Sequence, residues 1–294
     1  MQNRQLTIPL HNGGQIVLCT PAPERNYDLD RMGNLLSLPV DEGKPETMDT
    51  ELISADALPA GRHTMWKTAL TEIAFAEDWS HVLIAGWRKE PQRTTFYRHY
   101  VWQMSLIWGS MNALLKGRDV ILVHCSALET ERGAVLLFGE SGMGKSTASS
   151  RWRAQGGKCI SDDMALLDFS ERDQIYIRRM PTWSACREGK NEWNYPAGEE
   201  LPLACVLALG RSENEHDEIV ELSPAQYFAQ CYRSMFYWYT LNTKSLPDDM
   251  KACLANRIRQ FTERITRKYP PRALLTVLEG NDLRTVIEGY LQTQ

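Results

Sequence analysis

The chain has 294 residues, of which 43% are apolar and 24% charged, and 27 of its side chains are aromatic. This composition excludes a predominantly disordered chain, because it offers enough apolar surface for a buried core. The 33 basic and 37 acidic side chains give a net charge of −4. That balance argues against a nucleic-acid partner, since neutralising phosphates requires a basic field.

Membrane insertion and secretion are also disfavoured by the sequence. No apolar run reaches the roughly 18 residues needed to span a bilayer, and the N-terminus lacks a secretory pattern. The seven cysteines are scattered without a CxxC pair, which is typical of reduced thiols and not of a disulfide framework or zinc site. We therefore expect a cytoplasmic protein without a nucleic-acid or membrane partner.

The first 95 residues predict a small β-rich lobe. A hairpin is expected from Ile8 to Val17, around the Asn-Gly-Gly turn at 12–14. Two further strands are expected over 81–87 and 94–102. The polar stretch 28–62 contains three prolines and predicts mainly loop.

Residues 96–294 predict an α/β domain in which strands and helices alternate around a glycine-rich turn. The expected helices cover 100–116, 145–155, 223–239, 254–269 and 281–291. The expected strands cover 120–124, 134–138, 159–160, 164–169, 175–177, 203–209 and 274–278.

The glycine-rich turn follows the predicted strand 134–138. Residues 139–147 read GESGMGKST and match the pattern GxxxxGK[ST]. Glycines let successive N–H groups converge on phosphate oxygens, and the N-terminus of the following helix favours the same anion. The lysine supplies a charge for the β and γ phosphates, and the serine hydroxyl can ligate Mg²⁺. The nucleotide-binding residues predicted here are Gly139, Glu140, Ser141, Gly142, Met143, Gly144, Lys145, Ser146 and Thr147.

Three more side chains near this loop are candidates for chemistry. Asp162 and Asp163 end the predicted strand 159–160, and paired carboxylates can divide metal binding and proton acceptance between them. Two solvated turn aspartates are the alternative. His124 ends the run VILVH, where its alternation with apolar residues is also typical of a core histidine.

The segment VHCSALETERGAVLLFGESGMGKSTASSRWRAQGGKCISDDMALL (123–167) resembles the C-terminal kinase domain of bacterial HPr serine kinase/phosphorylase. It is closer still to the truncated HPr-kinase-like proteins encoded beside ribosomally made peptides, including the lasso-peptide kinases. In that family a histidine, the phosphate loop and an acid pair follow in the order seen here. The resemblance implies an α/β P-loop domain of HPr-kinase-like, PEP-carboxykinase-like type over 96–294. The β-rich lobe 1–95 would precede it, and its C-terminal part would be helical.

The resemblance also implies an activity: transfer of the ATP γ-phosphoryl group to a serine-type hydroxyl, with Mg²⁺ as cofactor. Asp162 would take the hydroxyl proton, and Asp163 would share Mg²⁺ with Ser146. His124 would lie near the transferring phosphate or orient Asp162, and Lys145 would hold the triphosphate. The expected acceptor is a peptide or small protein, most concretely a ribosomally synthesised peptide. A homo-oligomer is implied by the hexamers of HPr kinases.

The segment 178–198 departs from the family, because it lacks the glycine-rich signature that supports phosphorylase chemistry. A dedicated kinase is therefore expected. Arginines and lysines in this segment are candidates for substrate binding, with a solvated face as the alternative: Arg178, Arg179, Arg187 and Lys190.

Other interpretations stay open at this stage. The basic stretch 251–272 suits an acidic partner or an ordinary solvated helix face, and the aromatic run 235–239 suits a core or a subunit interface. A nucleotide-sensing scaffold without phosphate transfer and a small-molecule hydroxyl kinase are the alternative functions.

Overall fold

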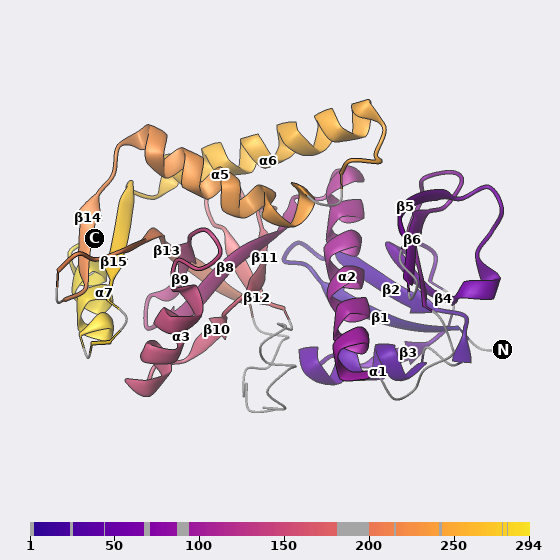
Figure 1. The fold of residues 1–294 in the computed structure, drawn as a ribbon, viewed down its shortest axis with the longest axis horizontal. Coiled ribbons are helices and arrows are strands. Elements are labelled where there is room, and N and C mark those ends of the chain that lie inside the picture. Colours follow the sequence, from indigo (N-terminus) through magenta and orange to yellow (C-terminus); the bar gives the residue numbers. More distant parts are fainter. Residues whose placement is uncertain are drawn as a thin grey trace. The chain divides into compact units, whose positions relative to one another are not determined.

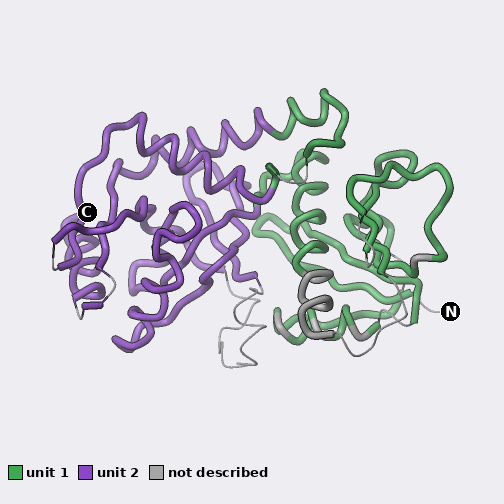
Figure 2. Tube along the Cα trace, in the orientation of Figure 1, with its two compact units in different colours: residues 1–121, 183–198, 239–254 green, residues 122–182, 199–238, 255–294 purple. Residues whose placement is uncertain are grey.

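The computed structural model describes residues 3–23, 26–43, 45–67, 71–86, 94–180, 200–214, 216–240, 243–277, 279–280 and 282–294. They form two compact units (Figure 2). The first is built around residues 1–121 with 239–254, and the second around 122–182, 199–238 and 255–294. Each unit contains its own β-sheet.

The first unit is a mixed sheet with two helices, α1 (Asn26–Leu36) and α2 (Thr94–Leu115), which contact each other and the sheet (Figure 1). The predicted N-terminal hairpin is confirmed: β1 and β2 pair antiparallel across a turn in which Gly13 has φ +75°. The strand order is β3-β1-β2-β4-β7-β6-β5. These strands are β1 (Arg4–Pro9), β2 (Gln15–Thr20), β3 (Val40–Glu42), β4 (Thr50–Ser54), β5 (His63–Lys67), β6 (Thr71–Phe75) and β7 (Val82–Gly86).

Two sequence predictions in this unit are wrong. The stretch 28–62, predicted mainly as loop, contains most of α1 together with β3 and β4. The helix forms because Leu29, Met32 and Leu36 fall on one face and are buried. Residues 94–102, predicted as a strand from their aromatic and β-branched content, begin α2 instead. As a whole, α2 contacts β2, β4 and β7, and tertiary contacts of a helix can override a modest local strand preference.

The second unit contains an eight-stranded mixed sheet with the order β10-β8-β11-β12-β13-β15-β14, in which β9 pairs with both β8 and β13. The seven strands predicted for this part of the chain are confirmed, and the sheet also contains β14, which was not predicted from the sequence. The strands of this sheet are β8 (Val120–Thr130), β9 (Gly133–Phe138), β10 (Cys159–Ser161), β11 (Met164–Asp168), β12 (Tyr176–Arg179), β13 (Glu200–Arg211), β14 (Glu218–Glu221) and β15 (Arg272–Thr276).

The parallel part of this sheet determines where a ligand can bind. β9 runs parallel to β13, and β13 runs parallel to β15. Because the carboxyl ends of parallel strands meet at one edge, the segments that follow them lie together there. The Arg211 guanidinium at the end of β13 accordingly donates to the Gly142 carbonyl in the loop after β9, at 3.2 Å.

Four helices accompany the second sheet in the described part of the chain: α3 (Lys145–Ala154), α5 (Pro224–Thr240), α6 (Asp248–Lys268) and α7 (Leu283–Gln292). They lie where the sequence predicts helices. In the described part of the chain, none of the helices has the length and hydrophobicity of a membrane span.

Several basic side chains of the stretch 251–272 form hydrogen bonds and ion pairs within the second unit. Arg264 donates to the carbonyls of Phe169 and Glu171, and Lys268 donates to that of Asp173. These carbonyls belong to the turn between β11 and β12, so the two basic side chains hold this turn against the helix. Arg259 pairs with Glu263 on α6 itself. These contacts favour the interpretation of the stretch as an ordinary helix face.

Candidate nucleotide-binding site

The predicted phosphate loop joins the buried strand β9 directly to α3. Gly144 caps the helix with φ +98°, and Gly142 has φ +84°; both values are costly for any residue with a Cβ atom. A Cβ at Gly142 would meet nothing within 4 Å, so the backbone conformation and not space requires glycine there. The free N–H groups at the start of α3 thus face the loop and form a ready anion site.

Lys145 lies folded into this loop. Its ammonium group donates to the carbonyl oxygens of Gly139 at 2.7 Å and Glu140 at 2.9 Å, and the residue is only 6% exposed. Burial lowers the pKa of Lys145, while the negative charges of Asp163 and Glu140 oppose that shift. The ammonium therefore stands at the start of the loop, where phosphate oxygens can replace the two carbonyls as its partners.

The two predicted acids occupy the turn between β10 and β11 and differ in surroundings. Asp163 is the more open, with a side chain 24% exposed, and its Oδ1 lies 3.7 Å from Nε2 of His124. Its charge also acts on Lys145. Asp162 is 5% exposed. Burial raises the pKa of Cys159 to about 11, and the charge of Asp162 adds to that rise.

His124 on β8 is 6% exposed and faces aromatic side chains of α5. Its ring stacks on Tyr237 with centroids 4.0 Å apart and meets Trp238 edge-on at 5.6 Å. Burial, followed by the positive charge of Lys145, lowers the pKa of His124 to about 3. The imidazole is therefore neutral near pH 7, and its contact with Asp163 is not an ion pair despite the short distance.

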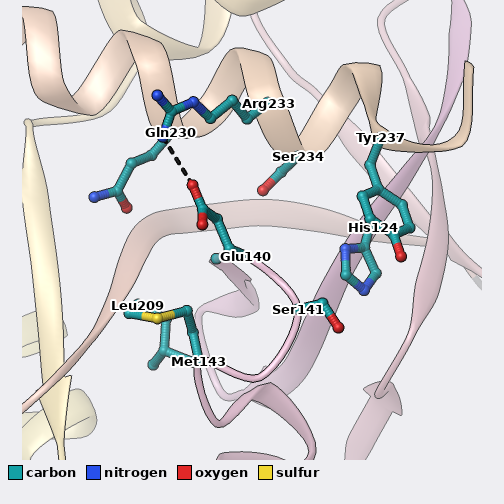
Figure 3. Close-up of a pocket in the computed structure, with 10 residues that line it drawn as sticks. His124, Glu140, Ser141, Met143, Leu209, Gln230, Arg233, Ser234 and Tyr237 are labelled. Atoms are coloured by element: carbon teal, nitrogen blue, oxygen red, sulfur yellow. Dashed lines mark hydrogen bonds and ion pairs between the residues drawn. The ribbon is translucent and has the colours of Figure 1, made fainter. Parts of the chain in front are cut away.

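A cavity of about 570 Å³ opens beside the loop (Figure 3), a size typical of small-ligand pockets. The loop and His124 form one side, and α5 forms the other. The α5 residues fall at helical spacing: Gln230, Arg233, Ser234 and Tyr237. Arg233 reaches across to Glu140, with its guanidinium 2.8 Å from the carboxylate.

Sequence reasoning missed this α5 wall. The polar spacing of Gln230, Arg233 and Ser234 within an otherwise aromatic helix was the available signal. Tyr237 belongs to the aromatic run 235–239, which is assigned from the sequence to a core or a subunit interface.

The remaining predicted site residues are not among those that line the cavity. Ser146 is exposed on the first turn of α3, and Thr147 is half-buried. Arg178 is buried and pairs with Glu200 across the β12–β13 ladder at 3.0 Å. Its neighbour Arg179 is equally buried, at 6% exposure. Arg187 and Lys190 lie outside the described residues.

Residues 97–288 match the family model of the SynChlorMet cassette protein ScmC. The chain belongs to this family. The match includes the phosphate loop, both acids, His124 and the whole of α5.

More distant similarity connects the chain to two enzymes. It is 29% identical over 162 residues to phosphoenolpyruvate carboxykinase (ATP) 2 of Salinibacter ruber (strain DSM 13855 / M31). That alignment covers 53% of this chain but only 27% of the relative, so the chain spans little more than a quarter of that protein's length. The Hpr(Ser) kinase/phosphatase from Coxiella burnetii is 18% identical, with a TM-score of 0.24, over 35% of this chain and 71% of that one.

Proposed function

We propose that the chain is an ATP- and Mg²⁺-dependent kinase that transfers the γ-phosphoryl group to a serine-type hydroxyl. One observation carries the proposal. A strand–loop–helix with left-handed glycines and a buried lysine lies beside an aspartate whose charge acts on that lysine. A nucleotide sensor needs only the loop and the lysine. Phosphoryl transfer also uses acids near the phosphates, one to hold the metal ion and one to accept a proton, and the pair Asp162 and Asp163 can fill these two roles. The similarity to an enzyme named for ATP supports the same donor.

The chemistry of the donor set fits a magnesium ion. Carboxylate and hydroxyl oxygens are the ligands Mg²⁺ takes in nucleotide sites, and Asp163 and Ser146 would hold it. Asp163 suits this role because its charge already acts on Lys145, the group expected to bind the terminal phosphates. Bound there, the ion would neutralise charge on the phosphate oxygens during transfer.

The chain's own residues would divide the rest of the work. Lys145 and the loop amides would hold the triphosphate, and Asp162 would accept the proton of the attacking hydroxyl. Neutral His124, stacked on Tyr237, would help to exclude water beside the transferring phosphate. Catalysis of this kind depends on positioning and on fixed charges.

The acceptor we propose is a peptide or small protein, most concretely a ribosomally synthesised peptide. The resemblance of residues 123–167 to peptide-cluster kinases supports this choice. The name of the family refers to a cassette, so the products of neighbouring genes are the first acceptors to test. A homo-oligomer in the cytoplasm is the expected working form.

Incubation of the full chain with labelled ATP, Mg²⁺ and candidate peptides tests the proposal, and labelled phosphoserine is the expected product. Asp162→Asn should lower the transfer rate by about 10²- to 10⁴-fold, the usual worth of a general base, while ATP binding persists. Lys145→Ala should instead weaken ATP binding in calorimetry. Asp248→Asn is the matched control, since that carboxylate is 98% exposed at the start of α6.

Two outcomes would contradict this assignment. Undiminished turnover in Asp162→Asn would remove Asp162 from the mechanism. ATP binding without any labelled product across peptides and small hydroxyl compounds would favour the nucleotide-sensing scaffold.

A further inference from the structure

The α5 side of the pocket carries a cation for which the proposed reaction so far has no role. Arg233 extends from α5 to the loop and pairs with Glu140, 93 positions away in the chain. Glu140 is an unexpected neighbour for a polyphosphate, because its carboxylate repels the anion that the loop is built to bind. The Arg233 guanidinium, which pairs with Glu140, therefore lies close to the place where the loop would bind a polyphosphate.

The position of Lys145 indicates which part of a nucleotide would lie there. Its ammonium group binds the carbonyls of Gly139 and Glu140. In a phosphate loop that ammonium contacts the β and γ phosphates. His124 lines the same pocket, and the Asp163 carboxylate lies 3.7 Å from the His124 imidazole. The Glu140 end of the loop is thus the end at which the terminal phosphate is expected.

The Arg233–Glu140 pair is also easy to exchange. The two side chains are 66% and 65% exposed, and an exposed ion pair contributes little net stability. A phosphate group offers the guanidinium fork two oxygens and a larger charge than one carboxylate. Arg233 therefore gains more from a terminal phosphate than it loses by releasing Glu140.

We propose that Arg233 binds the terminal phosphate of a nucleoside triphosphate and so makes the site select triphosphates over diphosphates. The ion pair with Glu140 would hold the arginine beside the loop until a triphosphate binds. The inference rests on the proposed function only in that the loop binds a nucleotide. It does not require phosphate to be transferred.

Calorimetry on the full chain with Mg²⁺ tests the inference, with a non-hydrolysable ATP analogue and ADP as the two ligands. Arg233→Ala should weaken binding of the triphosphate about 10- to 100-fold, the worth of a charge-assisted hydrogen-bond pair, and leave ADP binding unchanged. Arg233→Lys should give an intermediate loss, since it keeps the charge without the fork. Arg259→Ala is the matched control, because this arginine is also exposed and ion-paired, but to Glu263 on α6.

A second variant separates direct binding from mere screening of Glu140. If Arg233 only screens that carboxylate, the double variant Glu140→Gln/Arg233→Ala should regain wild-type affinity for the triphosphate. Direct binding predicts that the double variant stays weaker than the wild type, because loss of the Glu140 repulsion returns only part of the affinity. Full recovery, or an equal loss for both nucleotides, would overturn the proposal.

The inference and the proposed function fail in different ways. Unchanged triphosphate binding in Arg233→Ala, alongside a wild type that phosphorylates its acceptor, refutes the inference alone. A wild type that binds neither nucleotide refutes both. Because Arg233 is exposed, a thermal unfolding curve matching that of the wild type will confirm that its variants fold.

Discussion

A buried ion pair anchors the helix that follows the phosphate loop, and its removal gives a sharp test of the structure. Arg151 on α3 donates two hydrogen bonds to Asp217, whose side chain is 0% exposed. Asp217 also accepts from the Thr276 hydroxyl at 2.7 Å and the Val277 N–H at 3.0 Å. Arg151 further donates to the Gly280 carbonyl at 3.0 Å. The pair thus ties α3 to the end of β15 and the segment after it.

The expected cost follows from burial. Asp217→Asn leaves the Arg151 cation buried at 8% exposure with only the more exposed Asp282 carboxylate, 3.6 Å away, as a counter-charge. Breaking a buried ion pair in this way typically costs about 3–5 kcal/mol of unfolding free energy. Replacing both partners, as in Arg151→Met with Asp217→Ala, should cost less than the two single changes added together. A coupling free energy of about 1–3 kcal/mol is expected between groups in such direct contact.

The pH dependence of this cost gives a second check. Burial alone would raise the pKa of Asp217, but hydrogen bonds from Arg151, Thr276 and Val277 outweigh it and lower the pKa. A carboxyl whose pKa is lowered by folding stabilises the protein above its unfolded pKa of about 3.9, and this stability is lost as the pH falls through the folded value. The difference between wild type and Asp217→Asn should therefore be full at pH 7 and shrink in acid.

Urea unfolding at pH 7 measures the cost, and hydrogen exchange at the α3 amides localises it. Asp248→Asn is the control, because its pair with Lys251 is exposed and should change stability by less than about 0.5 kcal/mol. A loss below about 1 kcal/mol in Asp217→Asn, or a coupling near zero, would refute the anchoring role.

Two further predictions concern the loop and its histidine. Because folding lowers the pKa of His124 to about 3, the unfolded chain binds the extra proton below pH 6.5. Wild-type stability should thus fall by about 2 kcal/mol from pH 6.5 to 5 through this group; His124→Gln should remove that part of the slope, and parallel wild-type and variant curves would contradict the shift. Gly144→Ala should cost about 1–2 kcal/mol at φ +98° and abolish tight ATP binding in calorimetry. Gly117→Ala, at φ +86° with open space around it, should cost as much and leave ATP binding unchanged; equal ATP affinity in both variants would show that the left-handed turn at Gly144 does not shape the loop.

The half of the site that lies close together in sequence could be predicted without the structure. The loop glycines, Lys145 and the start of α3 follow from a local pattern, because the strand, turn and helix they require are consecutive. The turn that carries Asp162 and Asp163 is separated from the loop by a single helix and one short strand. The sequence can predict this part of the site because its elements follow one another in the chain, so their arrangement depends little on contacts with distant residues.

The α5 wall could not be predicted in this way. Arg233 and Tyr237 reach the pocket through contacts more than 90 positions away in sequence, to Glu140 and His124 respectively. The helical spacing of α5 predicts that faces exist, but not which face meets the loop. That choice depends on how α5 packs after β13 and β14, which is a property of the whole unit.

The aromatic run 235–239 shows why composition alone gave an ambiguous answer. Met235 and Tyr239 are 0% exposed and belong to the core, whereas Tyr237 is 37% exposed and lines the pocket. Trp238, which follows Tyr237 in the chain, is half-buried and meets the His124 ring edge-on. Each residue of a helix turns about 100° from the last, so neighbours in one run face different surroundings. The run thus contributes side chains both to the core and to the pocket. The rotation of α5 about its axis decides which of these side chains are buried and which line the pocket.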